Sequence, residues 1–539
     1  MIRISQIKMP ISHGPEELPA KAASLLHIRR NEILSWRIVR KSVDARKKPD
    51  ICFIYTVDME VRDEKRLLRR NAGRTQIQLA EDIPYHFPEC PPPSGIKRPV
   101  IIGTGPAGLF CGYLLALHGF RPILLERGKD VENRRKDVEN FWKNGILAPD
   151  SNVQFGEGGA GTFSDGKLNT LVRDKNGRNR EVLKLFVHAG APEEILYEAK
   201  PHIGTDILMR VVRKMREEIL SFGGEVRFES KVTDLIIEKG AVRGITVDGG
   251  ESLEADIVVL AIGHSARDTF RTLYEREVPM EAKAFAVGLR VEHPREMIDK
   301  IQYGMAENRF LRAADYKVTA QAGTRGVYSF CMCPGGYVVN ASSEQGRLAV
   351  NGMSYSGRNG KNSNSAVIVT VTPDDFESAH PLSGIAFQRN LEEKAYRAGQ
   401  GRIPVTYYGD FRKAVTGDAK TPSALSRKYP DFQPEIKGGW NFAPVHEILP
   451  EALNRAFVEG MEQFGRKMPG FSDSGVYVSG VESRTSSPVR IHRDETGQSE
   501  VRGLYPCGEG AGYAGGIMSA AMDGMLIAEK IAVQFRNMD

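Results

Sequence analysis

With 539 residues, the chain is longer than a single compact core usually allows, so we expect two or three domains. Its hydrophobic share of 41% and charged share of 26% are those of an ordinary globular protein. No apolar run approaches the roughly 18 residues that cross a bilayer, and the N-terminus lacks the apolar region and cleavage site of a secretory signal. We therefore expect a cytoplasmic protein with no membrane span.

The six cysteines are too sparse for a disulfide scaffold, and no two of them form a C-x-x-C pair. Such cysteine usage fits a reducing compartment, in agreement with a cytoplasmic location. No group of His, Cys and Asp residues has the spacing of metal ligands, so no metal site is predicted.

The first part of the chain, residues 1–90, is predicted to be a small basic α+β domain. Alternating apolar residues predict a strand over residues 2–7, and a charged turn separates strand-like stretches at 33–43 and 51–61. A helix is expected before this pair of strands, and a short basic helix, residues 63–70, after it. Helices packed on a small antiparallel sheet fit this order of elements.

The net charge of +6 is concentrated in this part of the chain. Residues 1–95 hold 17 Lys and Arg against 12 Asp and Glu, which is most of the excess. We favour a solvated basic face over nucleic-acid binding, because so small an excess is a weak signal. The cations that motivate the nucleic-acid alternative are Arg29, Arg30, Arg37, Arg40, Lys41, Arg46, Lys47 and Lys48.

A proline-rich stretch, residues 91–96, is predicted to be a linker. The chain then changes to alternating apolar strands and helices, which is typical of an α/β domain. We assign residues 97–274 to the first part of a Rossmann-like nucleotide-binding domain, residues 275–474 to a sheet-rich substrate domain, and residues 475–539 to the C-terminal part of the nucleotide-binding domain. The expected fold class is α/β, with a discontinuous nucleotide-binding domain and an inserted domain.

A glycine-rich motif follows the apolar strand predicted at residues 98–102 and opens the next helix. Gly103 permits a tight turn, Gly105 lets the backbone approach a pyrophosphate, and Gly108 lets the helix pack closely on the sheet. The helix N-terminus offers free N–H groups and a partial positive charge to the same anion. The pattern predicts a dinucleotide site at Gly103, Gly105, Pro106, Ala107 and Gly108.

An acidic residue completes the dinucleotide pattern. Glu126 ends the second predicted strand, 18 residues after Gly108. At this position a carboxylate accepts hydrogen bonds from an adenosine ribose. We therefore expect Glu126 and the adjacent Arg127 to contact the cofactor.

A second glycine motif, near the C-terminus, contains Gly508, Glu509, Gly515 and Gly516. It resembles the C-terminal motif of the glutathione-reductase-like FAD superfamily. The resemblance implies an acidic residue at the pyrophosphate–ribityl region, here Glu509 in place of the usual Asp, and a helix N-terminus that faces the flavin ring. A stretch that ends in Gly263 resembles the A-T-G strand of the same superfamily, with Ile262 at the Thr position. Val232 opens a strand where the superfamily contacts adenine. These resemblances imply FAD as the cofactor, with contacts at Val232, Gly263, Gly508, Glu509, Gly515, Gly516 and Ile517.

Three further stretches, residues 154–168, 328–336 and 482–491, resemble the uncharacterised bacterial FAD-dependent dehydrogenase family. With the N-terminal part, the resemblance covers essentially the whole chain and implies an FAD oxidoreductase. Backbone N–H groups of the first stretch are expected to cradle an oxyanion or the flavin N1–C2=O edge, with Lys167 adding a cation. The alternative is a flexible surface loop. The expected contacts in this loop are Gly158, Gly159, Gly161 and Thr162.

The candidate catalytic residues are Lys167, His264 and Arg484. His264 follows an apolar strand and is interpreted either as a base or as the cap of a turn. Arg484 lies among hydroxyl residues and either binds an anionic substrate or pairs with Glu482 as a buried structural residue. Cys331 and Cys333 are interpreted as structural or pocket cysteines, with a dithiol relay as the alternative.

The function expected from these features is hydride transfer between an unidentified small-molecule substrate and FAD, at the junction of the nucleotide-binding and middle domains. No second G-x-G-x-x-G follows a strand, so a dedicated NAD(P)H domain is not expected, whereas transient NAD(P)H docking stays open. Two alternatives remain. One is a flavoprotein that binds or modifies RNA through its basic N-terminal domain, and the other is a non-catalytic FAD-binding interaction protein.

Overall fold

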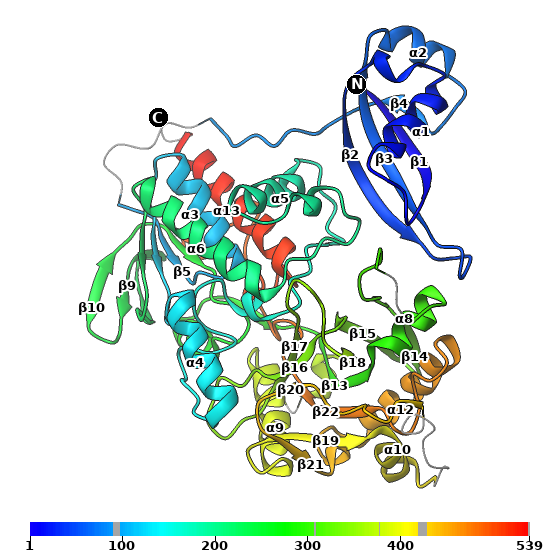
Figure 1. Ribbon diagram of the computed structural model, residues 1–539. Coiled ribbons are helices and arrows are strands. Elements are labelled where there is room, and N and C mark those ends of the chain that lie inside the picture. The colour runs from blue at the N-terminus through cyan, green and yellow to red at the C-terminus, as the bar shows by residue number, and fades with distance from the viewer. Residues whose placement is uncertain (90–96, 307–308, 377, 419–427, 537–539) are drawn as a thin grey trace.

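A computed structural model describes residues 1–89, 97–306, 309–376, 378–418 and 428–536 (Figure 1). It shows a mixed α/β architecture in which a small N-terminal unit stands beside two larger units, one around a parallel sheet and one around a long, largely antiparallel sheet. The predicted linker 91–96 lies outside the described residues. Within the described ranges, no helix is long and apolar enough to cross a membrane.

The N-terminal unit is a four-stranded antiparallel sheet with two helices, all of which share one core. Its elements are β1 (Ile2–Pro10), α1 (Glu17–Leu26), η1 (Arg30–Glu32), β2 (Ile33–Asp44), β3 (Cys52–Val61), α2 (Glu64–Arg70) and β4 (Ile77–Leu79). The strand order is β2-β3-β1-β4. The alternation of buried residues in β1 shifts at a bulge between Ile4 and Ile7. The sequence gives no signal for β4, because its three residues are too few to show a period.

Part of the predicted basic face contacts the rest of the chain. The backbone N–H of Lys41 donates to Tyr197, its carbonyl accepts from Ala199, and its ammonium lies 3.0 Å from the carboxylate of Glu198. Half of the cations named above have a carboxylate partner, which reduces the charge that a phosphate backbone would meet. The paired cations are Arg30, Arg37, Lys41 and Arg46. This pairing weakens the reason for the nucleic-acid alternative, which stays a prediction.

The second unit is built around five parallel strands whose mostly apolar sequences match burial on both faces. They are β5 (Val100–Ile102), β6 (Ile123–Leu125), β7 (Glu225–Arg227), β11 (Val258–Leu260) and β24 (Leu504–Pro506). Their order is β24-β11-β5-β6-β7. The chain moves outward from β5 to β6 and β7, and then returns to the other side of β5 with β11. The strand order therefore reverses next to β5, and α/β sheets bind ligands in the crevice at such a reversal.

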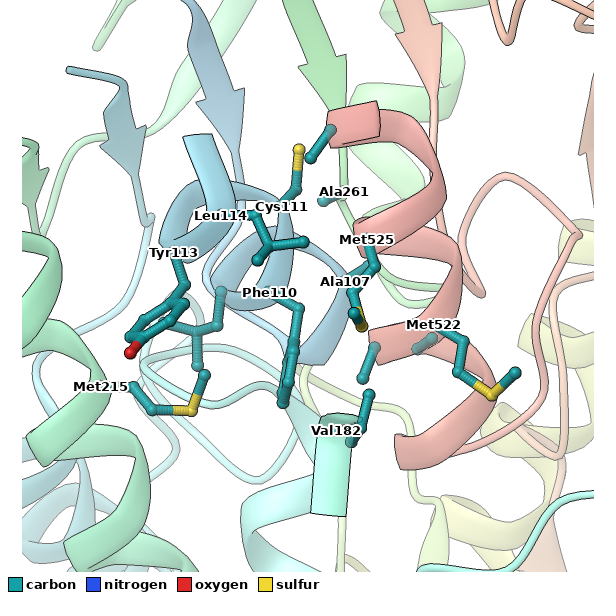
Figure 2. Close-up of a cluster of buried hydrophobic side chains, with 14 of the residues drawn as sticks. Ala107, Phe110, Cys111, Tyr113, Leu114, Val182, Met215, Ala261, Met522 and Met525 are labelled. Carbon is teal, nitrogen blue, oxygen red and sulfur yellow. The ribbon is translucent and has the colours of Figure 1, made fainter. Parts of the chain in front are cut away.

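Different layers cover the two faces of this sheet. One face, with Ile101 and Leu124, shares a core with α3 (Pro106–Leu117), α5 (Arg178–His188), α6 (Thr205–Ser221) and α13 (Ile517–Arg536). Phe110, Met215 and Met522 come from three of these helices and belong to that core, with Phe110 between the two methionines in Figure 2. The opposite face packs on a small antiparallel sheet of β8 (Val232–Glu238), β9 (Ala241–Val247) and β10 (Glu251–Glu254).

The third unit contains a seven-stranded sheet. Its strands are β13 (Phe285–Pro294), β14 (Thr319–Ala322), β15 (Arg325–Cys333), β18 (Asn362–Val371), β19 (Ile403–Tyr407), β21 (Trp440–Phe442) and β22 (Tyr477–Glu482). They follow the order β14-β15-β18-β13-β22-β19-β21, antiparallel except for the pair of β19 and β21. β22 lies beyond residue 474, where we expected the chain to return to the second unit. All six of its residues are buried, and the strand pairs with β13 and β19 instead.

The remaining elements connect and cover these layers. They are α4 (Val131–Asn144), η2 (Ala160–Phe163), η3 (Glu193–Leu196), α7 (Arg267–Glu275), β12 (Met280–Ala282), α8 (Arg295–Tyr303), β16 (Tyr337–Asn340), β17 (Val350–Met353), η4 (Pro373–Asp375), α9 (Ser383–Ala398), α10 (Tyr408–Thr416), β20 (Ile436–Lys437), η5 (Val445–Glu447), α12 (Glu451–Lys467) and β23 (Val489–Ile491). β12 pairs with β23, and β16 lies between β17 and β20. α8, α9, α10 and α12 pack on the seven-stranded sheet.

The close packing of α13 on α3 predicts that α13 does not tolerate a side chain at Gly524. A Cβ there would lie 2.1 Å from the carbonyl oxygen of Ala107, which belongs to the backbone of α3. We expect Gly524→Ala to lower the thermal unfolding temperature, at a cost of about 1–3 kcal/mol from overpacking. Gly250→Ala is the control, because nothing lies within 4 Å of a Cβ at Gly250. Equal losses of stability in both variants, measured by scanning calorimetry, would contradict this prediction.

Candidate functional site

A cavity of about 860 Å³ opens at the carboxyl ends of the parallel strands. Residues that end or directly follow β5, β6, β11 and β24 form one wall: Ile102, Leu125, Ala261 and Cys507. The opposite wall comes from the third unit and contains Phe330, Cys331, Asn351 and Glu482. The cavity therefore lies between the second and third units, at the reversal of strand order next to β5.

The first glycine loop has the geometry that its sequence predicts. Gly103 has a φ of 102°, and a Cβ there would lie 2.4 Å from the carbonyl oxygen of Ala261. A Cβ on Gly108 would lie 1.9 Å from the Gly103 oxygen, so the turn and the helix packing both require glycine. Gly105 differs, because it lines the cavity and the nearest atom to a Cβ there is the Cα of Gly159, at 3.8 Å. The missing side chain at Gly105 therefore keeps the cavity open.

Two helix N-termini meet at this wall. α3 begins at Pro106 and α13 at Ile517, and both residues line the cavity. Gly161 lies between them, since a Cβ on it would be 2.9 Å from Cγ1 of Ile517 and 3.7 Å from Cγ of Pro106. Helix N-termini present free N–H groups and a partial positive charge, so this wall is suited to an anion such as a pyrophosphate.

Glu126 holds the loops of this wall together. Its Oε2 accepts hydrogen bonds from the N–H and the hydroxyl of Thr104, at 3.0 and 2.8 Å. Its Oε1 accepts from the N–H groups of Gly128 and Gly156, at 2.9 and 3.0 Å. A carboxylate has about four acceptor sites, so protein donors fill them here. Glu126 lines the cavity, but it joins three loops, and its expected contact with a ribose stays a prediction.

Arg134 on α4 organises the second glycine loop. Its guanidinium is fully buried and donates to the backbone carbonyls of Asn152, Val153, Gly156, Glu157 and Gly159. Burial lowers the pKa of Arg134 to about 10. Sequence reasoning missed this residue. The available signal was its helical spacing, because Arg134 lies on the same face as the buried Val131 and Val138.

Most of the predicted cofactor contacts line the cavity: Gly103, Gly105, Pro106, Ala107, Glu126, Arg127, Gly159, Gly161, Val232, Gly263, Glu509, Gly515, Gly516 and Ile517. So do the three catalytic candidates, Lys167, His264 and Arg484. Four other predicted contacts are not among the lining residues: Gly108, Gly158, Thr162 and Gly508. They support the wall from behind. A Cβ on Gly158 would lie 2.1 Å from the Thr162 hydroxyl, and the Gly508 N–H donates to Asp523 at 2.7 Å.

Lys167 is held at the cavity by Asp165. Its ammonium lies 3.0 Å from the Asp165 carboxylate, which also accepts from Arg358 at 2.7 Å and from Ser354 at 2.6 Å. Burial would raise the pKa of Asp165, but Lys167 and Arg358 lower it to about 2. Burial would lower the pKa of Lys167, but Asp165 raises it above its ordinary value. Lys167 is therefore a fixed cation in the cavity wall.

Arg484 has a different partner from the one expected. Its Nε and Nη2 each lie 2.9 Å from an oxygen of Glu392, a residue of α9. Arg267 binds the same carboxylate at 2.7 and 2.8 Å. The alternative in which Arg484 pairs with Glu482 is wrong, because Arg290 binds Glu482 instead. Arg484 thus belongs to a buried cluster of two arginines and one carboxylate while it lines the cavity.

Arg290 and Glu482 form a second buried pair, which sequence reasoning also missed. Nε of Arg290 lies 2.8 Å from Oε2 of Glu482, and both side chains are almost completely buried. Burial raises the pKa of Glu482 to about 7, although Arg290 opposes the shift. A carboxyl group that titrates near neutrality in a cavity wall is suited to accept a proton. The sequence signal was Arg290 itself, a cation that interrupts the apolar run of β13.

His264 lies beside Glu509, in the loop that follows the strand β11. Its Nδ1 is 3.5 Å from Oε1 of Glu509. The ring lines the cavity, and its buried Nε2 has no hydrogen-bond partner in the part of the chain that the structure describes. A buried polar atom of this kind is a position where a ligand can bond. The assignment of His264 as a base stays a prediction.

The residues present fit the expected FAD. The cavity volume lies in the upper part of the range for cofactor sites, which is about 300–1,000 Å³. The backbone at Gly515 and Gly516 is open to the cavity, because nothing lies within 4 Å of a Cβ added at either residue. The two helix N-termini suit a pyrophosphate, and the Nε2 of His264 offers a further polar contact.

Comparison with known sequences agrees with this fit. The family model described as "FAD-dependent protein, C-terminal domain-like" matches residues 284–485, and a domain of unknown function, DUF8436, matches residues 1–60. A protein of Clostridium beijerinckii (strain ATCC 51743 / NCIMB 8052), described as an uncharacterized protein, is 45% identical over 544 residues, which cover 99% of each chain.

Several solved structures are distantly similar. Quinol fumarate reductase FrdA of E. coli is 13% identical with a TM-score of 0.34, over 82% of this chain and 70% of that chain. L-proline dehydrogenase of P. horikoshii is 12% identical with a TM-score of 0.33, over 81% and 94%. CtdE in complex with FAD is 15% identical with a TM-score of 0.30, over 80% and 83%. At these scores, the likeness carries no argument about cofactor or reaction.

The carbonyl contacts of Arg134 predict that its removal weakens cofactor binding. Arg134→Met keeps most of the side-chain volume but deprives the loop carbonyls of their charged donor. We expect the affinity of the apoprotein for FAD to fall at least about tenfold, or about 1.4 kcal/mol, in a fluorescence titration. Arg135→Met is the matched control, because Arg135 is exposed and pairs with the likewise exposed Glu139 on the same helix. Its effect should stay below about twofold, and equal affinities of the two variants would refute the role of Arg134.

Proposed function

Because the chain belongs to the family of FAD-dependent proteins that carry this C-terminal domain, with FAD as its cofactor, we propose that it is an oxidoreductase. It transfers hydride between a small-molecule substrate and the flavin. In this proposal, the parallel-sheet unit is a discontinuous Rossmann-like FAD domain of the glutathione-reductase-like superfamily. The inserted sheet-rich unit binds the substrate, and residues 1–90 form a separate α+β domain.

One observation carries the proposal, which is that a single cavity has two chemically different walls. One wall consists of glycine loops and helix N-termini, and the other contains titratable side chains of the third unit. Bound FAD supplies a two-electron acceptor or donor. A protein that holds FAD only as a structural cofactor needs no wall with Glu482 and Cys331 beside it. The non-catalytic alternative therefore leaves this wall unexplained.

Four residues that line the cavity suggest separate roles in the reaction. Lys167, fixed by Asp165, offsets negative charge on the substrate or the charge that develops during transfer. Glu482 accepts a proton at its carboxylate from a substrate O–H, N–H or S–H group, because its pKa is about 7. Arg484 is a positioning residue, since its Nε and Nη2 already donate to the carboxylate of Glu392. His264 is the second candidate for proton transfer.

The proposal is tested by anaerobic mixing of the holoprotein with NADPH, NADH and a panel of small-molecule electron donors. We expect at least one donor to bleach the absorbance of the oxidised flavin. Reduction with dithionite is the control that shows the flavin to be reducible in this protein. If dithionite bleaches the flavin and no donor does, the non-catalytic alternative is favoured.

The raised pKa of Glu482 predicts how kcat/KM depends on pH for any donor that reduces the flavin. Since only the carboxylate form accepts a proton, kcat/KM should rise as the pH passes through about 7 and level off above it. Glu482→Gln should lose this rise and lower the plateau by about 10²–10⁴-fold, the usual contribution of a general base. Glu281→Gln is the control, because Glu281 is exposed and does not line the cavity. A rise at the same pH in Glu482→Gln would assign the titration to another group.

A further inference from the structure

Two cysteines in the wall of the third unit have no part in the hydride transfer proposed above. Cys331 lines the cavity, whereas Cys333 is fully buried behind it. β15 bulges between Phe330 and Cys333 in its pairing with β18, and Cys331 has a left-handed backbone with a φ of 40°. Residues with a Cβ adopt this conformation rarely, and such residues cluster at functional sites.

The spacing of the two residues suits a reversible bond between their sulfurs. In a regular strand, the Cα atoms of residues i and i+2 lie about 6.6 Å apart, near the upper limit of about 6.8 Å for a disulfide. The bulge bends the strand here, and Sγ of Cys333 lies 3.3 Å from the carbonyl oxygen of Cys331. Constrained disulfides of this kind are reduced more easily than structural ones.

A buried cation stands directly behind the pair. Nη1 and Nη2 of Arg290 donate to the carbonyl oxygen of Cys331 at 3.0 and 3.1 Å, and Nη1 lies 3.7 Å from Sγ of Cys333. Gly352 leaves room for this guanidinium, because a Cβ on it would lie 1.9 Å from Nη1. Glu482 binds Nε from the other side. Arg290 is therefore held in place next to the Cys333 sulfur and the Cys331 carbonyl.

The charges around the pair favour a thiolate at Cys331 and a thiol at Cys333. A hydrogen bond from Cys333 lowers the pKa of Cys331 to about 6, aided by Arg290 and Lys167, while burial and Asp165 oppose the shift. Burial raises the pKa of Cys333 well above its ordinary value. At pH 7, the nucleophilic form is therefore the sulfur at the cavity, and the protonated sulfur lies behind it.

We propose that Cys331 and Cys333 are a redox-active pair that passes electrons to the flavin, and that the substrate of this cavity is a small dithiol, whose electrons reach the flavin through this pair and not by direct hydride transfer from the substrate. The inference rests on the proposed oxidoreductase function. The Cys331 thiolate and the Cys333 thiol form one S–S bond, and two electrons and the Cys333 proton pass to oxidised FAD, so that charge and hydrogen balance. A substrate dithiol restores the pair by thiol–disulfide exchange, releases one proton and leaves as its own disulfide. Cys331 is the sulfur that the substrate reaches.

The first test uses the apoprotein and does not depend on flavin chemistry. Alkylation of Cys331 by iodoacetamide, followed by peptide mass spectrometry, should have a pH midpoint near 6. An unstructured cysteine peptide should have a midpoint near 8.5. Cys333→Ala should move the midpoint of Cys331 upward, because it removes the hydrogen-bond donor. Mild oxidation with diamide should yield a Cys331–Cys333 disulfide. A midpoint at about 8 or above, or the absence of that disulfide, overturns the proposal.

The second test uses the holoprotein with dithiothreitol as the probe, in the absence of oxygen. Dithiothreitol should bleach the flavin of the wild type, and at least about tenfold more slowly in Cys331→Ser and Cys333→Ser, because both sulfurs are needed for exchange. Cys52→Ser, in β3 outside the cavity, should match the wild type. A full complement of FAD and bleaching by dithionite show that each variant is folded.

The outcomes separate this inference from the proposed function. Equal rates of flavin bleaching by dithiothreitol in all four proteins overturn the proposed redox role of the cysteine pair. The proposed function still stands if another donor bleaches the flavin. If no donor bleaches the flavin although the apoprotein forms the disulfide, the proposed function is overturned. Electron transfer from the cysteine pair to the flavin is then overturned as well.

Discussion

The functional site depends on the ion pairs of the Glu392 carboxylate, because they join the two units that border the cavity. Arg267 of α7 and Arg484, which follows β22, bind its two oxygens through hydrogen bonds of 2.7 to 2.9 Å. All three side chains are almost completely buried. Burial would raise the pKa of Glu392, but the two guanidinium groups lower it well below its ordinary value. Loss of Glu392 would leave two buried guanidinium groups without their shared carboxylate, and removal of one partner from a buried ion pair costs about 3–5 kcal/mol in comparable cases.

Charged residues also shape the glycine loops from inside the protein. Glu126 accepts backbone N–H groups from three loops, and Arg134 donates to the carbonyls of the loop that contains Gly156, which is one of these three. These buried groups satisfy backbone atoms that no helix or strand pairs. A dinucleotide motif therefore marks the place of the cofactor, whereas the path of the loops depends on residues that the motif does not contain.

The chemistry of the cavity comes mainly from the inserted sheet. β13, β15 and β22 place Arg290, Cys331 and Glu482 next to one another, although these residues lie far apart along the chain. Low dielectric and close charges give each group a different protonation state, as the lowered pKa of Cys331 and the raised pKa of Glu482 show. The parallel-sheet unit thus provides the FAD site that we propose, and the third unit provides the groups that would act beside it.

The sequence by itself determined the features that depend on local chain geometry. The apolar strands before Gly103 and Gly263, the start of α3 at Pro106 and the glycines that cannot carry a Cβ all follow from neighbouring residues. Only the tertiary structure decided which charges meet. Arg484 binds Glu392 rather than the nearby Glu482, and Arg134 is buried while Arg135 is exposed. The physical reason is that an ion pair or a shifted pKa depends on groups brought together by long-range packing. The separation of two groups along the chain does not show whether packing brings them together.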